Sequence, residues 1–98
     1  MKPDNKANKI IKSAALLKAI GHPIRVKIIR CLSSNTFMTV TELSELLSID
    51  QPVISLHLGV LRKHNVIKVR KDGKKSIYSI ADISTKQIIN ITYNTINT

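Results

Sequence analysis

Hydrophobic residues recur at helical spacing in the first third of the chain and predict two helices there. The first is expected to run from about Ala7 to Gly21, where the glycine ends it. The second is expected to begin at Pro23, because proline suits the first turn of a helix, and to break at the polar run Ser33-Ser34-Asn35. Residues 1–6 are polar and charged, so we expect a flexible basic tail before the first helix.

A pair of helices close together is predicted between residues 39 and 64. Thr39 and Glu42 have the spacing of a capping box, in which a hydroxyl and a carboxylate bond the free amides of a first helical turn. Asp50 is expected to cap the next helix, which carries Pro52 in its first turn and runs to about His64. Two helices joined by about three residues form a helix-turn-helix, and the second helix of such a pair is the candidate for the major groove of DNA.

The next segment has the alternating pattern of a β-hairpin. Residues 66–70 alternate apolar and basic side chains, and residues 76–80 return as a second strand. Asp72-Gly73 lies between them and is a strong signal for a hairpin turn. A hairpin that follows a helix-turn-helix is typical of a wing.

A last helix completes the expected fold. Ser84 and Gln87 repeat the capping-box spacing and are expected to open it. The sequence therefore predicts a mostly α-helical protein with a small β-hairpin wing. We expect a winged helix-turn-helix of about five helices and a two- to three-stranded antiparallel sheet, in one domain over residues 7–98.

The charge of the chain indicates what kind of partner it has. The sequence contains 16 Lys and Arg against 6 Asp and Glu, a formal charge of +10, which favours nucleic acid first and an anionic membrane second. A run that we call the basic stripe places seven of the basic residues within positions 62–75. A basic run alone is about as often a solvated face. One that follows a helix-turn-helix and lies on a hairpin favours the backbone of double-stranded DNA. The stripe consists of Arg62, Lys63, Lys68, Arg70, Lys71, Lys74 and Lys75.

Apolar runs and cysteine content indicate where such a protein works. The longest strictly apolar run is four residues, Ala14 to Leu17, which is too short for a membrane span or a secretory signal. The single cysteine, Cys31, cannot form an internal disulfide. We expect a cytoplasmic protein that does not associate with a membrane.

Two groups of residues are candidates for DNA contact. On the fourth predicted helix, Ile54, Leu58 and Leu61 share the face that must be buried, and the opposite face is nearly uncharged. Small polar and apolar side chains there can approach base edges. The candidates for base contact are Gln51, Pro52, Ser55, Leu56, His57 and Lys63. The candidates for the phosphate backbone are Thr39, Thr41, Arg70, Lys71, Lys74 and Lys75.

Two of these candidates have an alternative interpretation. Leu56 could instead pack on a neighbouring element of the same chain. His57 lies at the edge of the buried face, so a packed, hydrogen-bonded histidine and a groove contact fit the pattern equally well.

No metal site, cofactor site or catalytic site is predicted. His57 and His64 are seven residues apart on one helix, roughly 10 Å at 1.5 Å per residue, so they cannot share an ion. His22, next to Pro23, fits a helix start better than a ligand. The chain lacks Gly-x-Ser-x-Gly, His-Glu-x-x-His and a Gly-rich phosphate loop. Cys31, among apolar neighbours, is expected to be a buried small hydrophobe and not a nucleophile. We therefore do not expect an enzyme.

The chain from Leu17 to Ala81 resembles the ArsR/SmtB family of bacterial winged-helix repressors. The resemblance rests on the first helix boundary (residues 18–25), the Thr41-Glu42-Leu43 opening of the third helix and the run from Gln51 to Leu58. The segments Val60-Leu61-Arg62, Lys71-Asp72-Gly73-Lys74 and Ile77-Tyr78 complete it. This resemblance implies a dimer held by the first and last helices, repression of an operon and release when an inducer binds.

The departures from the family pattern concern its sensor sites. Thr39-Val40-Thr41 stands where metal-sensing members carry Cys-x-Cys, and threonine cannot replace a thiolate ligand. Residues 84–98 contain neither the acids nor the histidine of a second metal site, nor the partner cysteine of the persulfide-sensing branch. The resemblance therefore does not identify an effector. Pro52 and Leu56 also differ from the small polar residues or histidine that members often have, so the operator sequence is expected to differ.

Two function classes are compatible with these features of the sequence. The first is a homodimeric repressor that reads a palindromic operator, with the apolar excess of the first and last helices as its interface. The second is an architectural or protein-interaction winged helix without a specific operator. The candidate interface residues are Ile10, Ile11, Ala14, Ile88, Ile89 and Ile96.

Overall fold

The computed structural model describes residues 4–97 and contains five helices and a three-stranded antiparallel sheet within them, as the sequence predicts. The sheet has the order β1-β3-β2. The elements are α1 (Asp4–Ile20), α2 (Pro23–Asn35), β1 (Met38–Thr39), α3 (Val40–Leu47), α4 (Gln51–Lys63), β2 (Ile67–Asp72), β3 (Lys75–Ile80) and α5 (Ile83–Thr95).

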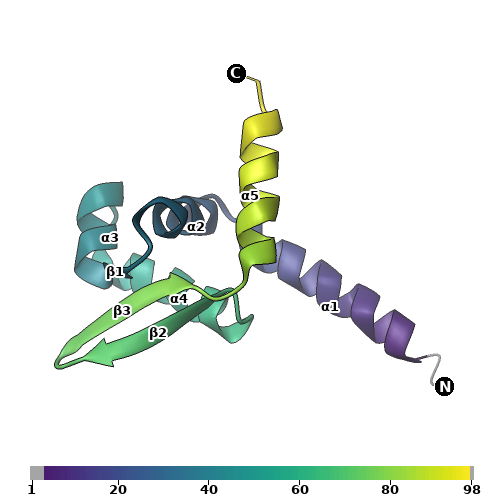
Figure 1. Ribbon diagram of the computed structural model, residues 1–98, viewed down its shortest axis with the longest axis horizontal. Helices are drawn as coiled ribbons and strands as arrows, with labels where there is room; N and C mark the ends of the chain where they lie inside the picture. Colours follow the sequence, from purple (N-terminus) through teal and green to yellow (C-terminus); the bar gives the residue numbers. More distant parts are fainter. Residues whose placement is uncertain (1–3, 98) are drawn as a thin grey trace.

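The core lies where α2, α3 and α4 meet the base of the hairpin (Figure 1). Ile54, Leu58 and Leu61 of α4 are fully buried, so the buried face predicted for this helix is confirmed. Ile28 and Ile29 of α2 are fully buried and belong to the same core cluster. Burying side chains of this size contributes roughly 1.5–3 kcal/mol each, which fixes α4 against α2.

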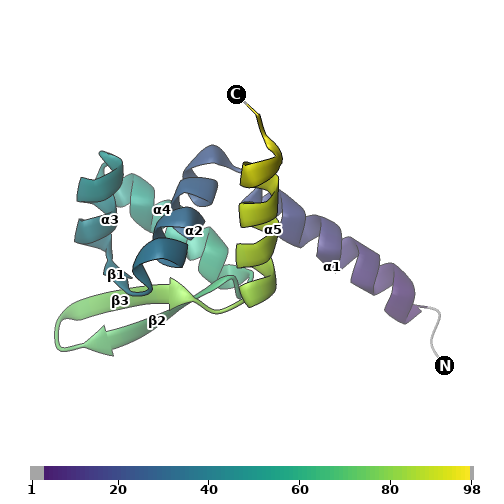
Figure 2. The ribbon, with the colours of Figure 1, turned by 45° about the horizontal axis from the view of Figure 1, so that its top comes forward.

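Two helices project from this body. Both α1 and α5 extend away from the helix-turn-helix and the hairpin (Figures 1 and 2). The molecule consequently measures 47 × 39 × 21 Å along its principal axes. On α5, Arg30 of α2 places its guanidinium 3.5 Å from the centre of the Tyr93 ring and donates to Asn90 Oδ1 at 3.3 Å. These contacts hold the middle of α5 on α2, while one side of each projecting helix stays uncovered.

The ends of the first two helices differ from the sequence prediction. Helix α1 is already formed at Asp4, so the expected tail of residues 1–6 is helical in its last part, and residues 1–3 lie outside the described residues. Helix α2 continues to Asn35 instead of breaking at Ser33, because the two polar side chains bond carbonyls one turn back. Ser33 Oγ donates to the Ile29 carbonyl at 2.7 Å, and Asn35 Nδ2 donates to the Cys31 carbonyl at 2.9 Å.

Helix caps follow the prediction at the starts of α2 and α3 and differ from it at the starts of α4 and α5. His22 caps α2, because its Nδ1 accepts the Ile24 amide at 3.1 Å, which agrees with its expected role at a helix start. Asp50 precedes α4, but its side chain makes no capping bond. Helix α5 is capped by Asp82 and not by Ser84: the Asp82 carboxylate accepts the Ser84 amide at 3.0 Å.

The hairpin turn lies one residue later than predicted. Asp72 pairs with Lys75, so the two turn residues are Gly73 and Lys74. Gly73 has a φ of +63°, which glycine adopts without steric cost at the first position of a tight hairpin turn. A third strand, β1, adds to the hairpin by pairing with Ile77 and Tyr78 of β3.

Candidate nucleic-acid interface

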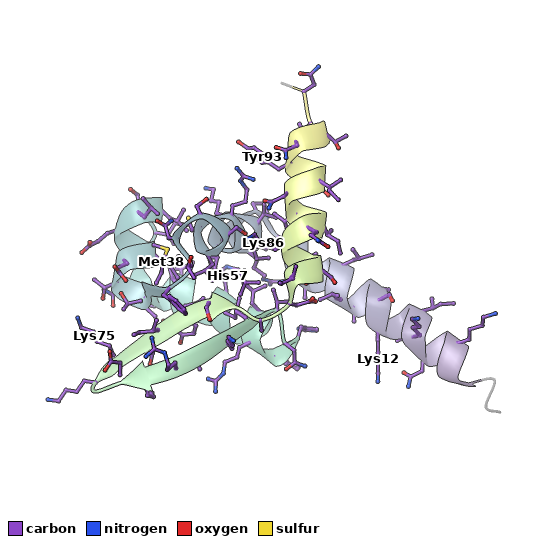
Figure 3. The ribbon with its side chains drawn as sticks, viewed as in Figure 1. Lys12, Met38, His57, Lys75, Lys86 and Tyr93 are labelled. Atoms are coloured by element: carbon purple, nitrogen blue, oxygen red, sulfur yellow. The ribbon has the colours of Figure 1, made fainter. Side chains whose placement is uncertain are left out.

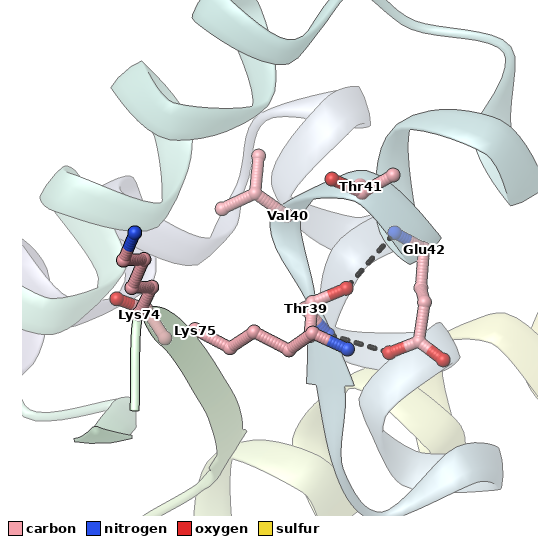
Figure 4. Close-up of a pocket in the computed structure, with 7 residues that line it drawn as sticks. Thr39, Val40, Thr41, Glu42, Lys74 and Lys75 are labelled. Atoms are coloured by element: carbon pink, nitrogen blue, oxygen red, sulfur yellow. Dashed lines mark hydrogen bonds between the residues drawn. The ribbon is translucent and has the colours of Figure 1, made fainter. Parts of the chain in front are cut away.

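The start of α3 is held beside the hairpin. Strand β1 pairs with β3 and leads directly into α3, so the first turn of this helix lies next to the wing. The predicted capping box is present: Thr39 Oγ1 accepts the Glu42 amide at 3.2 Å, and Glu42 Oε1 accepts the Thr39 amide at 2.9 Å. Both bonds are drawn in Figure 4.

A shallow hollow of about 540 Å³ separates this helix start from the wing tip. It brings together four residues that the sequence predicts as backbone contacts, two from α3 and its cap and two from the hairpin. Figure 4 shows Lys75 extended toward the capping box. The hollow therefore offers hydroxyl and ammonium donors on its two sides. The four predicted residues are Thr39, Thr41, Lys74 and Lys75.

An acid also lies in this hollow. The hydrogen bond from the Thr39 amide is the largest cause that lowers the pKa of the Glu42 carboxyl, and the Thr39 hydroxyl lowers it further. Desolvation opposes these two effects, and the Lys75 charge makes the smallest contribution to lowering the pKa. The sequence predicts Glu42 only as part of the helix cap. Its position opposite Lys75 could not be found without the pairing of β1 with β3.

The outward face of α4 is exposed and nearly uncharged. Leu56 is 66% exposed, so the alternative that it packs on a neighbouring element of the same chain is wrong. Gln51 Nε2 donates to Thr41 Oγ1 at 3.3 Å, which ties the start of α4 to the start of α3. Sequence reasoning missed Val53, which is 38% exposed one residue before the buried Ile54. The predicted base contacts on this exposed face are Gln51, Pro52, Ser55, Leu56 and Lys63.

His57 does not belong to that face. Its side chain is only 7% exposed, and its Nδ1 accepts the Arg25 Nε hydrogen at 3.2 Å. In Figure 3 it lies among the packed helices and away from the wing tip marked by Lys75. Of the two interpretations that the sequence left open, the packed, hydrogen-bonded histidine is correct, and the assignment to base contact is wrong.

The basic stripe is exposed along its whole length. All seven members, from Arg62 at the end of α4 to Lys75 at the start of β3, are exposed. Arg70 also lies 5.8 Å from the centre of the Phe37 ring, an exposed aromatic side chain that the sequence analysis did not single out. Lys74 and Lys75 line the hollow, and the other members of the basic stripe lie along β2 and at the end of α4.

The candidate interface residues on the projecting helices divide into three groups. Ile10 and Ile11 of α1 are each 67% exposed, and Ala14 and Ile96 are exposed as well. Ile88 is half-buried. Ile89 is only 6% exposed and belongs to the core of the protomer, so its assignment to a dimer interface is wrong.

Other chemistry is sparse among the described residues. Across residues 4–97, no three His, Cys, Asp or Glu side chains are placed to hold a metal ion. Cys31 is half-buried and not fully buried as expected, and burial raises the pKa of its thiol although the Arg30 charge opposes the shift. No helix in this part of the chain is long and apolar enough to cross a membrane.

Known proteins share both the sequence and this arrangement. The model of the arsR family of bacterial regulatory proteins matches residues 22–69, from the α2 cap into the wing. The HTH-type transcriptional regulator MJ1325 of Methanocaldococcus jannaschii is 39% identical over 80 residues, which are 82% of this chain and 90% of that protein. The chain belongs to the ArsR family.

Solved structures of related regulators have the same fold. The transcriptional repressor BigR from Xylella fastidiosa superposes with a TM-score of 0.83 at 28% identity, over 100% of this chain and 99% of that one. The DNA-binding domain of Mb0332 from Mycobacterium bovis, described as a homodimeric winged helix-turn-helix, gives 0.85 at 19% identity over 95% and 85%. The second likeness shows the fold alone. This ArsR-family chain is thus a transcriptional regulator and not an enzyme.

Proposed function

We propose that this ArsR-family regulator binds a palindromic DNA operator as a homodimer, with α4 in the major groove and the wing on the phosphate backbone. The observation that carries the proposal is the continuous exposed surface formed by the outer face of α4, the α3 start and the wing. On α4 this surface presents the uncharged side chains of Ser55 and Leu56, and at the wing tip it presents the cationic Lys74 and Lys75. An uncharged surface can contact base edges, and a cationic surface can bind phosphates.

The dimer is supported by the uncovered apolar side of the terminal helices. Ile10 and Ile11 of α1 and Ile91 of α5 are each 67% exposed, which is costly in water for side chains of this size. A symmetric dimer would cover them and would place two copies of α4 about 34 Å apart, one turn of DNA.

Repression by occlusion of a promoter is the regulatory mode that we favour, because BigR is a repressor with the same fold over the full length of this chain. A repressor must reach its operator on the chromosome. We therefore propose that the protein is cytoplasmic. A reporter gene under the operator should be silenced by the protein. Activation of the reporter would reverse the assigned sign of regulation without affecting the DNA-binding proposal.

The test separates the reading of bases from the binding of phosphates. An operator is first selected from a pool of random duplexes. Lys71, Lys74 and Lys75 are then changed together to Ala, and binding to operator and random duplex should weaken alike. The log–log salt slope should flatten by about one unit for each phosphate that the variant no longer neutralises. Gln51→Ala or Leu56→Ala should cost on the order of 1–3 kcal/mol per half-site on the operator only, with the salt slope unchanged.

Ile54→Ala is the matched control on the same helix. This side chain is fully buried, so its truncation should cost about 2–5 kcal/mol of stability and weaken all DNA binding through loss of the fold. If folded Gln51 and Leu56 variants lose operator and random binding equally, α4 does not read bases. The architectural function would then replace the proposed one.

A further inference from the structure

One guanidinium connects three helices beneath the candidate DNA-binding surface. Arg25, in the first turn of α2, donates from Nη1 to the Ala19 carbonyl at 2.8 Å. That carbonyl lies in the last turn of α1, where backbone acceptors lack a partner within the helix. The same guanidinium donates from Nε to His57 Nδ1 at 3.2 Å, on the inner side of α4. Arg25 therefore ties the end of a projecting helix to the helix proposed to read DNA.

A second imidazole completes this cluster. The ring centre of His22 lies 4.5 Å from that of His57, and His22 Nδ1 is occupied as the cap of α2. The groups that act on the His57 charge are thus His22 and Arg25. The Arg25 guanidinium is always charged and would repel a positive charge on His57. Desolvation by burial is the largest cause that lowers the pKa of His57, and His22 and Arg25 lower it further.

The hydrogen bond between Arg25 and His57 requires a neutral imidazole ring. Because Nδ1 of His57 accepts a hydrogen from Arg25, the ring must be neutral and carry its hydrogen on Nε2. Adding a proton to Nδ1 would turn the acceptor into a donor that faces another donor. It would also place two cations in direct contact. Either Arg25 or the ring must then move, and the bond between α2 and α4 breaks.

We propose that Arg25 is a positioning residue that holds α4 against the end of α1 through His57, and that protonation of His57 releases this link and weakens operator binding. The inference rests on the proposed function. It makes operator recognition sensitive to acid, whereas binding of random duplex, which depends on the exposed basic stripe, keeps its affinity. The measurable quantity is therefore the ratio of operator affinity to random-duplex affinity.

The experiment measures this ratio between pH 7.5 and 5.5 at constant salt, with circular dichroism to verify folding at each pH. A difference of one unit between the His57 pKa in the free and the operator-bound protein corresponds to about a tenfold fall in operator affinity only below both pKa values. Because the pKa of His57 is lowered in the free protein, we expect the operator affinity of the natural protein to fall progressively toward pH 5.5, by a few-fold and by less than about tenfold. His57→Asn keeps an acceptor near the Nδ1 position but does not titrate in this range, so its ratio should stay constant.

Matched variants identify the cause of the effect. His64→Asn removes another half-buried histidine of the same segment, one that does not contact Arg25, and should leave the acid sensitivity intact. Arg25→Lys cannot make both bonds of the guanidinium, so it should lower the ratio at pH 7.5 and flatten its pH dependence. A ratio that does not change with pH in the natural protein, or that falls equally in His57→Asn, overturns the proposal.

A spectroscopic measurement covers the case in which a variant fails to fold. Ring-nitrogen NMR of the natural protein should show an unprotonated, hydrogen-bonded Nδ1 for His57 and a lower pKa with operator than without. An equal pKa in both states overturns the inference. If no operator can be selected at pH 7.5, the proposed function itself fails, which is a different outcome from a pH-independent ratio.

Discussion

Gly59 lies on the exposed side of α4, one turn beyond Ser55, and its place in a helix is unfavourable. A Cβ added there would meet nothing within 4 Å, so no packing requires glycine. Gly59→Ala should raise the free energy of unfolding by about 0.5–1 kcal/mol, because alanine loses less backbone entropy in a helix. If α4 enters the groove, the added methyl group should also reduce operator affinity. Thermal unfolding and operator titration measure the two effects, and a variant that is less stable would contradict the prediction.

The burial of a single residue was predictable from the sequence where the residue lies in the middle of one face of a helix. Ile54, Leu58 and Leu61 follow from spacing alone, because three buried positions at helical intervals define a core face. The burial of His57 and Ile89 was not predictable in this way, because it depends on partners that are distant in sequence. His57 accepts a hydrogen bond from Arg25, which is 32 residues away, and no local pattern contains that contact.

At the scale of one element, the capping box of α3 predicts a dependence of stability on pH. The Glu42 pKa is lowered in the folded protein, chiefly by the Thr39 amide, so the unfolded chain binds the proton more tightly. The contribution of Glu42 is therefore fully present above the unfolded pKa of 4.5 and is lost as the pH falls through the lower, folded value. Glu42→Gln keeps an acceptor for the Thr39 amide without titrating. The stability difference between natural protein and variant should shrink from pH 7 to pH 3 in denaturant titrations.

A Glu42→Gln difference that stays constant over this range would show that the carboxylate contributes nothing through its charge. Thr39→Ala is the companion variant, because it removes the other half of the box. Its cost should be about 1 kcal/mol at pH 7, as for other hydroxyl N-caps.

Helix and strand identities were predictable, but several of their ends were not, because ends depend on competition for individual amides. Pro52 has no amide hydrogen and the Val53 amide is bonded to the Asp50 carbonyl at 3.0 Å, so the Asp50 side chain finds no capping partner. At α5, the Val66 carbonyl accepts the amides of Ala81 and Asp82 at 2.9 and 3.3 Å. This contact between distant segments fixes Asp82, and not Ser84, at the helix start.

At the scale of the whole molecule, the arrangement of α1 and α5 was the least predictable from the chain. The apolar excess of both helices is visible in the sequence, and it indicates a surface to be covered. Its partition between the protomer core and an exposed side depends on how α5 rests on α2 through Arg30 and Tyr93. That packing buries Ile89 and leaves Ile91 exposed. Only the exposed portion remains available to a second copy.

The exposed portion of α1 should hold the dimer together. Ile10 and Ile11 do not belong to the protomer core, so changing both to Ser should leave the fold of the monomer intact. Burial of an isoleucine is worth about 1.5–3 kcal/mol, and each substitution occurs twice in a symmetric dimer. The dimer dissociation constant measured by sedimentation equilibrium should therefore rise by more than about a hundredfold. Footprints should shrink from two half-sites to one. Leu46→Ser, an equally uncharged change at a 58% exposed position on α3, should leave the dimer unchanged. A natural protein that sediments as a monomer at micromolar concentration with and without operator would contradict the interface, since the uncovered faces of α1 and α5 would then have no partner copy.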